Sequence, residues 1–183
     1  VTGSNGLLGQ KLTRLLAPME KVELIATGKG ADRYPDQRYQ YTYCQLDITN
    51  AGQVMDVIAT QQPDAIINTA AITNVDQCAT DQEACWNLNV QAVENLVNAC
   101  AAYQVFLLHL STDFIFDGQD GPYPEDAAAK PISYYGESKL ASEDLLQKSS
   151  IKWAIARTVL VYGIAHDMSR SNIILWVKNS LEK

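Results

Sequence analysis

The sequence is poor in side chains that bind metals or form cross-links, with only two histidines and four cysteines among its 183 residues. The cysteines are Cys44, Cys78, Cys85 and Cys100, and no two of them form a C-x-x-C pair. A zinc site needs clustered ligands at short spacing, so no metal site is expected. The first residues show no basic segment followed by an apolar run, so no signal peptide is expected in them. Four thiols in such an acidic chain predict reduced cysteines and a cytoplasmic protein.

Long hydrophobic runs and an excess of positive charge are also missing. Apolar stretches reach six residues at most, well below the ~20 that a membrane helix needs. A membrane is therefore not an expected partner. The 14 basic and 21 acidic residues leave a net charge of −7, which repels phosphate backbones, so a nucleic acid is not an expected partner either. The 47% hydrophobic content is too high for disorder and is typical of a folded domain.

Strand-like and helix-like segments alternate along the chain. Alternation of this kind predicts right-handed βαβ units, which build a parallel sheet covered on both faces. The expected fold class is therefore α/β, a Rossmann-like doubly wound parallel sheet. Strands are predicted at residues 22–27, 44–48, 65–69, 105–110 and 153–158. Helices are predicted at residues 6–17, 50–61 with Asn50 as the cap, 80–103 with a Thr80-x-x-Glu83 capping box, and 135–148.

A glycine turn leads straight into the first predicted helix. Gly3, Gly6 and Gly9 are spaced as G-x-x-G-x-x-G. Glycine permits positive φ and a close approach of the backbone to a pyrophosphate, while the helix N-terminus offers free N–H donors. Glycine is also common in ordinary turns, so the helix and strands that follow are what favour a dinucleotide site.

The ends of the next strands bear on the choice of cofactor. In dinucleotide-binding folds an acidic residue after the second strand binds the ribose 2′-hydroxyl of NAD, and a basic one accommodates the 2′-phosphate of NADP. Here residues 26–29 hold no carboxylate, and Lys29 is nearby, which favours NADP(H), with NAD(H) as the alternative. Lys29 could equally be a solvated loop lysine. Asp47 could accept a hydrogen bond from the adenine amine, or it could be an ordinary turn aspartate. The small residues 68–71 would let a dinucleotide lie flat over the strand ends, or they could serve ordinary packing of a helix on the sheet.

Two hydroxyl groups and a lysine are the catalytic candidates. Tyr135 and Lys139 stand at i and i+4, so on a helix they project from one face. A neighbouring ammonium lowers the pKa of a phenol, which suits acid–base work, although a Y-x-x-x-K pattern often arises by chance. Thr112 follows an apolar strand, where it could bind a carbonyl or simply form a turn. His109, inside that strand, is interpreted as a hydrogen-bonded buried histidine rather than a catalytic one.

Taken together, these motifs resemble the extended short-chain dehydrogenase/reductase superfamily. The matching pieces, in the family's order, are the glycine turn, Asp47-Ile48, Asn68-Thr69-Ala70-Ala71, Asn89, Ser111-Thr112, Tyr135-x-x-x-Lys139 and Arg157 with Val161-Tyr162-Gly163. Three stretches, at residues 63–76, 111–118 and 122–139, resemble the dTDP-4-dehydrorhamnose reductase family in particular.

The resemblance implies an NADPH-dependent reductase of a 4-keto-6-deoxy sugar nucleotide. Tyr135 would protonate the nascent alkoxide, Lys139 would lower the tyrosine pKa and hold the nicotinamide ribose, and Thr112 would orient the carbonyl. Asn89 is expected to tie helix to strand more than to touch substrate. The cofactor contacts implied are Gly3, Asn5, Gly6, Leu7, Leu8, Gly9, Lys29, Asp47, Ile48, Ala70, Ala71, Thr73, Asn89, Tyr135 and Lys139.

Three alternatives are weighed. A dehydratase is disfavoured, because Asp113 is followed by Phe114 where dehydratases of the superfamily carry an Asp-Glu pair. A nucleotide-sugar epimerase keeps the same threonine, tyrosine and lysine. A non-catalytic NADP-binding regulatory subunit is the third, and the presence of all three candidate residues argues against it.

The motifs also predict the domain organisation. Residues 1–162 are expected to form the dinucleotide-binding domain, with its first strand truncated to Val1-Thr2. Residues 163–183, which end on a helical pattern, are expected to begin a small C-terminal substrate-binding region. A longer native chain is therefore expected, and a homodimer is left open.

Overall fold

The computed structural model describes residues 1–33, 40–166 and 173–182. Its strands are β1 (Ile25–Gly28), β2 (Thr42–Gln45), β3 (Ala65–Asn68), β4 (Phe106–Thr112) and β5 (Trp153–Thr158). Its longer helices are α1 (Leu7–Leu16), α2 (Ala51–Gln61), α5 (Ala92–Tyr103), α6 (Tyr134–Lys148) and α7 (Ile173–Leu181). The shorter ones are α3 (Val75–Thr80), α4 (Gln82–Trp86), the π-helical η1 (Asn87–Gln91) and the 3-10 turn η2 (Asp113–Ile115).

The strands form one parallel sheet, completed at its centre by the first two residues. β1 pairs with β2, and β4 pairs with both β3 and β5, always in parallel. Thr2 bridges Thr27 of β1 on one side and Asn68 of β3 on the other. The order is thus β2, β1, Val1-Thr2, β3, β4, β5. This confirms the doubly wound parallel sheet, in which Thr2 lies between β1 and β3.

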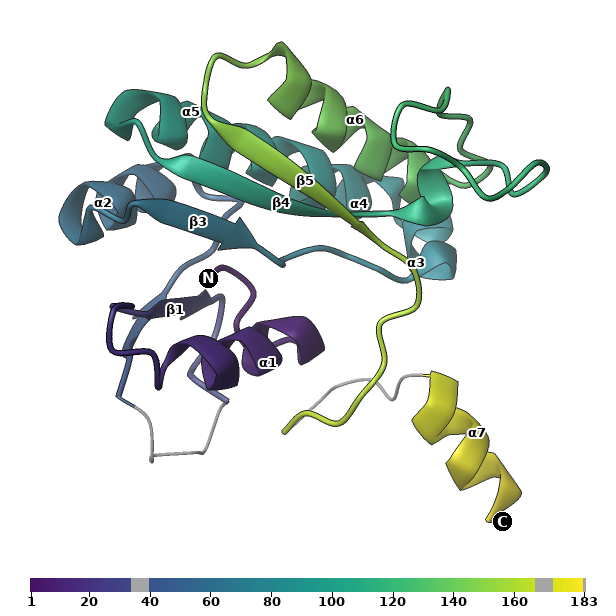
Figure 1. Cartoon of the computed structure of the whole chain (residues 1–183), viewed down its shortest axis with the longest axis horizontal. Coiled ribbons are helices and arrows are strands. Elements are labelled where there is room, and N and C mark those ends of the chain that lie inside the picture. The colour runs from purple at the N-terminus through teal and green to yellow at the C-terminus, as the bar shows by residue number, and fades with distance from the viewer. Residues whose placement is uncertain (34–39, 167–172, 183) are drawn as a thin grey trace.

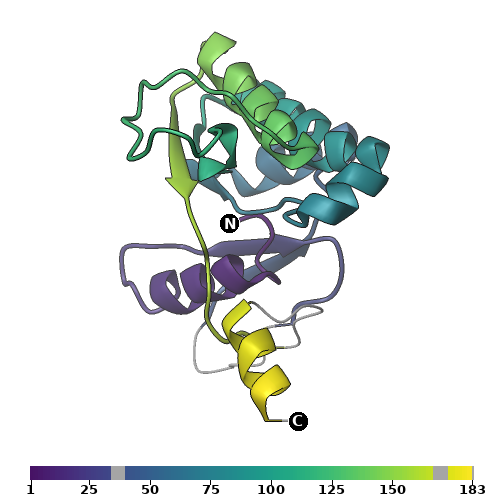
Figure 2. The ribbon, with the colours of Figure 1, turned by 90° about the vertical axis from the view of Figure 1, so that its right-hand side faces the viewer.

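The helices divide between the two faces of this sheet. α5 packs against both α2 and α6, and Figures 1 and 2 show these three helices side by side, with α1 apart from them. Right-handed connections that cross a sheet in opposite directions place their helices on opposite faces, so α1 covers the other face. Apolar side chains of β3, β4, α2 and α5, including Ile66, Leu107, Val54 and Leu96, form the main core beneath the three helices.

Several predicted boundaries were wrong. β1 begins at Ile25 rather than residue 22, and β2 runs from Thr42 to Gln45 rather than over 44–48. The predicted long helix over 80–103 is broken into α4, η1 and α5. Thr80 does not cap it, because it is still the last residue of α3, and the Asp81 carboxylate accepts the Ala84 N–H instead.

The expectation of four reduced cysteines was also wrong. Cys78 and Cys85 form a disulfide, with their Cα atoms 5.1 Å apart. The cause is local: α3 and α4 turn back on each other at Asp81, which brings the two thiols together. Cys44 and Cys100 are free.

Candidate cofactor pocket and catalytic residues

A cavity of about 440 Å³ lies at the carboxyl ends of the central strands. The chain reverses its direction across the sheet between β1 and β3, and open α/β sheets bind ligands outside the strand ends at such a point. Its lining residues follow four neighbouring strands, with a further contribution from α4 and η1: Gly3, Asn5, Gly6, Gly28, Lys29, Leu46, Asp47, Ile48, Thr49, Thr69, Ala70, Ala71, Ile72, Ala84, Asn87 and Leu88.

The glycine turn presses the start of α1 against the strand ends. Gly3 has a φ of +68°, and a Cβ there would lie 2.8 Å from the Ala70 nitrogen. A Cβ at Gly9 would lie only 2.3 Å from the Gly3 carbonyl oxygen. No side chain caps α1 at Gly6, and its first turn holds no acidic residue. The free N–H groups and the helix dipole therefore suit a phosphate group, so the turn fits a dinucleotide.

Gly9→Ala tests this close packing. The added methyl group has no room, so we expect the free energy of unfolding to fall by about 1–3 kcal/mol and dinucleotide binding to weaken. Urea unfolding and a fluorescence titration with NADPH measure the two effects. Gly30→Ala is the matched control, because a Cβ at Gly30 meets nothing within 4 Å. Equal stability of the two variants would contradict the proposed packing.

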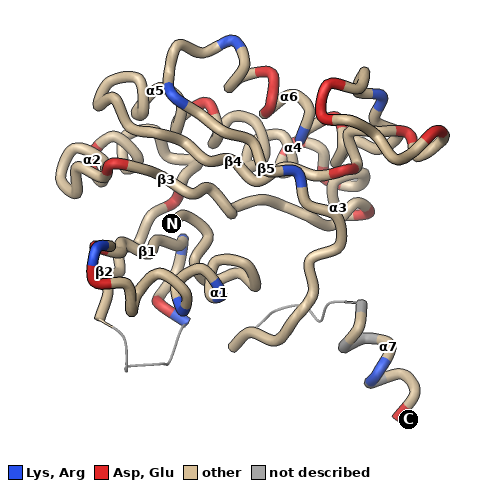
Figure 3. Tube along the Cα trace, viewed as in Figure 1, with Lys and Arg blue, Asp and Glu red and all other residues tan. Residues whose placement is uncertain are grey.

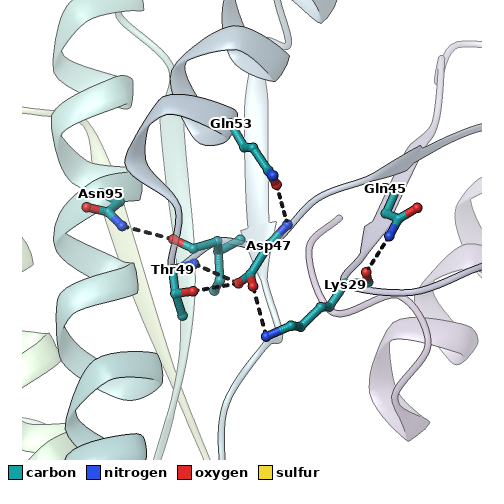
Figure 4. Close-up of polar contacts among 7 residues, drawn as sticks. Lys29, Gln45, Asp47, Thr49, Gln53 and Asn95 are labelled. Carbon is teal, nitrogen blue, oxygen red and sulfur yellow. Dashed lines mark hydrogen bonds and ion pairs between the residues drawn. The ribbon is translucent and has the colours of Figure 1, made fainter.

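Lys29 and Asp47, both predicted to face the cofactor, form an ion pair at the mouth of this cavity (Figure 4). The Lys29 Nζ lies 2.9 Å from the Asp47 carboxylate, and its side chain is 81% exposed. Thr49 donates to the same carboxylate from its hydroxyl at 2.7 Å and its backbone N–H at 3.1 Å. Burial raises the pKa of Asp47, but the hydrogen bonds from Lys29 and Thr49 outweigh it and lower the pKa overall. Since an exposed ion pair contributes little stability, Lys29 can leave it for a stronger anion.

Thr112 and Tyr135 come together where β4 meets α6. Thr112 ends β4, and its hydroxyl contacts the Asp113 carboxylate and accepts the Phe114 N–H. Ser133 caps α6 by accepting the Gly136 N–H. A Cβ at Gly136 would lie 2.3 Å from the Phe114 carbonyl oxygen, so only glycine lets α6 approach η2 this closely. The Tyr135 ring consequently packs edge-on against Phe114, 5.8 Å between centroids.

The environment of Tyr135 differs from the prediction in one respect. Burial raises its pKa and the Asp113 carboxylate adds to the rise, while the Thr112 hydroxyl lowers it. Lys139 was expected to lower the tyrosine pKa, but its Nζ instead donates to the Leu110 carbonyl at 2.8 Å and lies 3.0 Å from the His109 Nε2. The net effect keeps the phenol protonated, which is the form that a general acid requires.

Ile72 links the cavity to Tyr135. It lines the cavity and also packs against the cluster of Cys78, Cys85 and Tyr135. Asn89 holds this segment: its side chain donates to the Ile72 carbonyl at 3.0 Å and accepts the Ile72 N–H at 2.9 Å. Asn89 also donates to the Ser138 hydroxyl of α6 at 3.0 Å. Asn89 is fully buried and ties η1 to the segment after β3 and to α6, where the sequence predicted a tie between helix and strand.

The predicted cofactor residues therefore fall into two groups. Eight of them line the cavity: Gly3, Asn5, Gly6, Lys29, Asp47, Ile48, Ala70 and Ala71. The others lie outside its lining: Leu7, Leu8, Gly9, Thr73, Asn89, Tyr135 and Lys139.

Eight lining residues were not among the predicted cofactor contacts, although Thr69 belongs to the stretch of small residues 68–71 noted in the sequence. Gly28, Leu46, Thr49, Thr69 and Ile72 adjoin predicted positions at strand ends, so the convergence of those ends would have found them. Ala84, Asn87 and Leu88 come from α4 and η1, whose placement over the cavity no motif indicates.

Within residues 1–33, 40–166 and 173–182, no helix combines the length and apolar character needed to cross a membrane. Over the same residues, no three or more His, Cys, Asp or Glu side chains gather into a group able to hold a metal ion.

Comparison with known proteins places these features in a family. A family model described as the RmlD substrate binding domain matches residues 1–179. A dTDP-4-dehydrorhamnose reductase of Aggregatibacter actinomycetemcomitans is 35% identical over 164 residues, which cover 89% of this chain and 51% of that protein. Methionine adenosyltransferase 2 subunit beta of Xenopus tropicalis is 30% identical over 175 residues, covering 96% of this chain and 50% of that protein.

A solved structure agrees. The dTDP-4-dehydrorhamnose reductase of Bacillus anthracis, in complex with NADP, is 28% identical with a TM-score of 0.80, and the match covers 100% of this chain and 59% of that one. The chain spans about half the length of the curated relatives it matches.

Proposed function

Because the chain belongs to the RmlD substrate binding domain family, within the extended short-chain dehydrogenase/reductase superfamily, we propose that it carries the cofactor site and catalytic residues of an NADPH-dependent reductase. The proposed substrate is a 4-keto-6-deoxy sugar nucleotide. One observation carries the proposal: Ile72 lines the cavity at the strand ends and also packs against the cluster that contains Tyr135. Tyr135 in turn contacts the Thr112 hydroxyl. The proposed proton donor and the proposed dinucleotide site are thus neighbours.

In the proposed reaction, NADPH held in the cavity would supply a hydride to the ketone carbon. Thr112 orients the carbonyl oxygen, and Tyr135 donates its proton to that oxygen as negative charge develops, so hydride and proton together give the alcohol. The raised pKa of Tyr135 keeps that proton in place before the reaction. The Lys139 amine donates to the Leu110 carbonyl and belongs to the residue one helical turn after Tyr135. Lys139 is proposed to hold the nicotinamide ribose.

The proposal is tested by incubating the protein, with its whole native chain, with NADPH and dTDP-4-keto-6-deoxy sugar. We expect the absorbance of NADPH to fall steadily, with one NADPH consumed for each alcohol formed. Absence of NADPH consumption across a panel of sugar nucleotides, in a protein that binds NADPH, would refute the reductase assignment.

Lys29→Ala tests the proposed preference for NADP(H). A phosphate on the ribose 2′-oxygen offers Lys29 a doubly charged partner in place of Asp47, so the variant should bind NADPH about tenfold more weakly and NADH unchanged. Fluorescence titrations with the two cofactors measure the ratio. Lys148→Ala is the control, because Lys148 pairs on the surface of α6 with Asp144. Equal weakening for both cofactors would mean that Lys29 does not read the 2′-phosphate.

Two other functions are separated by the same assay. The similarity to methionine adenosyltransferase 2 subunit beta favours a non-catalytic NADP-binding subunit as the second candidate. Such a protein would bind NADPH and leave it unconsumed with every sugar nucleotide. An epimerase would convert sugar nucleotide while its bound cofactor is recycled, so product would form with no net loss of NADPH.

The proposed partners follow from the same site. A sugar nucleotide is the expected small-molecule partner, and nucleic acid is not, since lysines and arginines are scattered over several elements, while acidic residues gather on the loop before α6 (Figure 3). A cytoplasmic location and a homodimer stay predictions.

A further inference from the structure

A buried chain of polar side chains runs from the edge of the cavity to Lys139. The Asn68 Oδ1 accepts the Ala70 N–H at 3.2 Å and the Thr2 hydroxyl at 2.6 Å. The Asn68 Nδ2 lies 3.1 Å from the His109 Nδ1. The exposed fractions of Thr2, Asn68, His109 and Lys139 are all 4% or less, so these groups are shielded from bulk solvent.

The orientation of the Asn68 amide is set by the backbone. A backbone N–H can only donate, so the side-chain atom that faces the Ala70 nitrogen must be the oxygen. The Asn68 NH₂ group therefore faces the imidazole and donates to the His109 Nδ1. An acceptor nitrogen carries no proton, and this fixes the tautomer of His109.

The remaining ring nitrogen then carries the single proton of the neutral imidazole. Burial, with a smaller effect of the Lys139 charge, lowers the pKa of His109 well below its usual value, so the ring is neutral. The Nε2–H faces two atoms, the Ser142 Oγ and the Lys139 Nζ, both at 3.0 Å. The Ser142 hydroxyl donates its own hydrogen to the Lys139 carbonyl at 2.7 Å, which leaves its oxygen free to accept.

We propose that His109 is a positioning residue whose Nε2–H tautomer, fixed through Asn68 by the Ala70 amide, controls the protonation of Lys139. A protonated Nε2 cannot accept from an ammonium group. When Lys139 is neutral, its amine nitrogen accepts the Nε2–H. When Lys139 is charged, its ammonium group donates to the Leu110 carbonyl, and the Nε2–H donates to the Ser142 hydroxyl instead. The relevance to catalysis rests on the proposed function, since Lys139 lies one turn from Tyr135.

Burial and the neighbouring Glu143 carboxylate change the pKa of Lys139 in opposite directions. Burial lowers the pKa of Lys139 to about 8, and the Glu143 carboxylate, one turn further along α6, opposes that decrease. Glu143 is itself paired with Arg157 of β5 at 2.7 Å. From β4 the titratable group that contacts Lys139 is His109, at 3.0 Å between Nζ and Nε2, and Tyr135 precedes Lys139 by one turn on the same helix. The net effect is a pKa of about 8 for Lys139.

The tautomer is measured directly by ¹H–¹⁵N correlation of the histidine rings in uniformly labelled protein, with His166→Gln assigning the two histidines. We expect the His109 Nε2 to be protonated and the Nδ1 to be bare at every pH at which the protein is folded. A protonated Nδ1, or an imidazolium, would overturn the proposal.

Two variants should move the Lys139 titration in opposite directions. In Asn68→Asp the carboxylate still accepts from Ala70 but cannot donate to Nδ1, so the proton moves to Nδ1 and the bare Nε2 accepts from the ammonium. We expect the proton affinity of Lys139 to rise about tenfold. In Ser142→Ala the Nε2–H has Lys139 as its remaining acceptor, so the proton affinity should fall. NMR titration of ¹³C-labelled lysine side chains measures both variants, with Asn50→Asp, a cap exchange on α2, as the control.

The outcomes separate this proposal from the proposed function. If neither variant moves the Lys139 titration, or if Asn68→Asp leaves the proton on Nε2, His109 has a purely structural role. If the titrations move as expected while the protein consumes no NADPH with any sugar nucleotide, the proposal on His109 stands and the reductase assignment fails.

Discussion

Turnover of a Tyr135→Phe variant should fall by at least about 100-fold, while NADPH binds as it does to the unmodified protein. The reason is that phenylalanine keeps the ring packing against Phe114 and the Cys78–Cys85 cluster and removes only the hydroxyl that donates the proton. Because burial raises the pKa of Tyr135, that hydroxyl is still protonated when the reduction requires its proton. Steady-state NADPH oxidation gives the turnover, and a fluorescence titration gives the dissociation constant.

Tyr134→Phe is the matched control for this experiment. Tyr134 is the adjacent residue of the same helix, and its ring contacts Trp86 at 6.3 Å between centroids. Its hydroxyl has no part in the proposed reaction, so the control variant should turn over at nearly the normal rate. A Tyr135→Phe variant with unchanged turnover would remove Tyr135 from the mechanism. Loss of NADPH binding together with turnover would instead indicate a role in the cofactor site.

The sequence located the cavity because parallel strands bring their carboxyl ends to one edge. Gly3, Lys29 and Ala70 follow predicted strand segments, Asp47 lies near the end of one, and all four line the cavity. Locating the strands approximately was sufficient for this: β1 ends at Gly28, one residue beyond its predicted end, and β2 ends at Gln45, three residues before its predicted end.

The contacts that join distant segments could not be predicted in the same way. Asn68 and His109 are 41 residues apart, and His109 and Lys139 are 30 apart. The sequence correctly predicted a buried, hydrogen-bonded histidine, but nothing in it indicates that Lys139 would contact His109 rather than lower the pKa of Tyr135. That choice depends on how α6 packs against β4, which no local pattern encodes.

The helical region before β4 shows a second limit. The predicted capping box and the continuous helix follow correct local preferences, yet α3 continues through Thr80 and the chain turns at Asp81. The turn brings Cys78 to Cys85, and η1 then places Asn89 against Ile72 and Ser138. These tertiary contacts outweigh local propensity in this segment.

Arg157→Met should lower the free energy of unfolding by about 3–5 kcal/mol. Glu143 is fully buried and receives two hydrogen bonds from Arg157, from Nε at 3.1 Å and from Nη2 at 2.7 Å. Removing the guanidinium leaves a buried carboxylate without its partner, and it also releases the Glu125 carbonyl, which accepts from Nη1 at 2.7 Å. Urea unfolding of the variant measures the loss.

Two further variants show whether the cost comes from the orphaned charge. Lys148→Met breaks the exposed pair with Asp144 on the same helix, so it should cost no more than about 0.5 kcal/mol. Glu143→Gln combined with Arg157→Met removes both charges and should recover most of the lost stability, because a neutral amide is far less costly to bury than a carboxylate. If the double variant were as unstable as Arg157→Met alone, the loss would come from the packing of Arg157 over the Phe116 ring. The contribution of Arg157 to the free energy of unfolding would then not depend on the charge of Glu143, the carboxylate that also acts on Lys139.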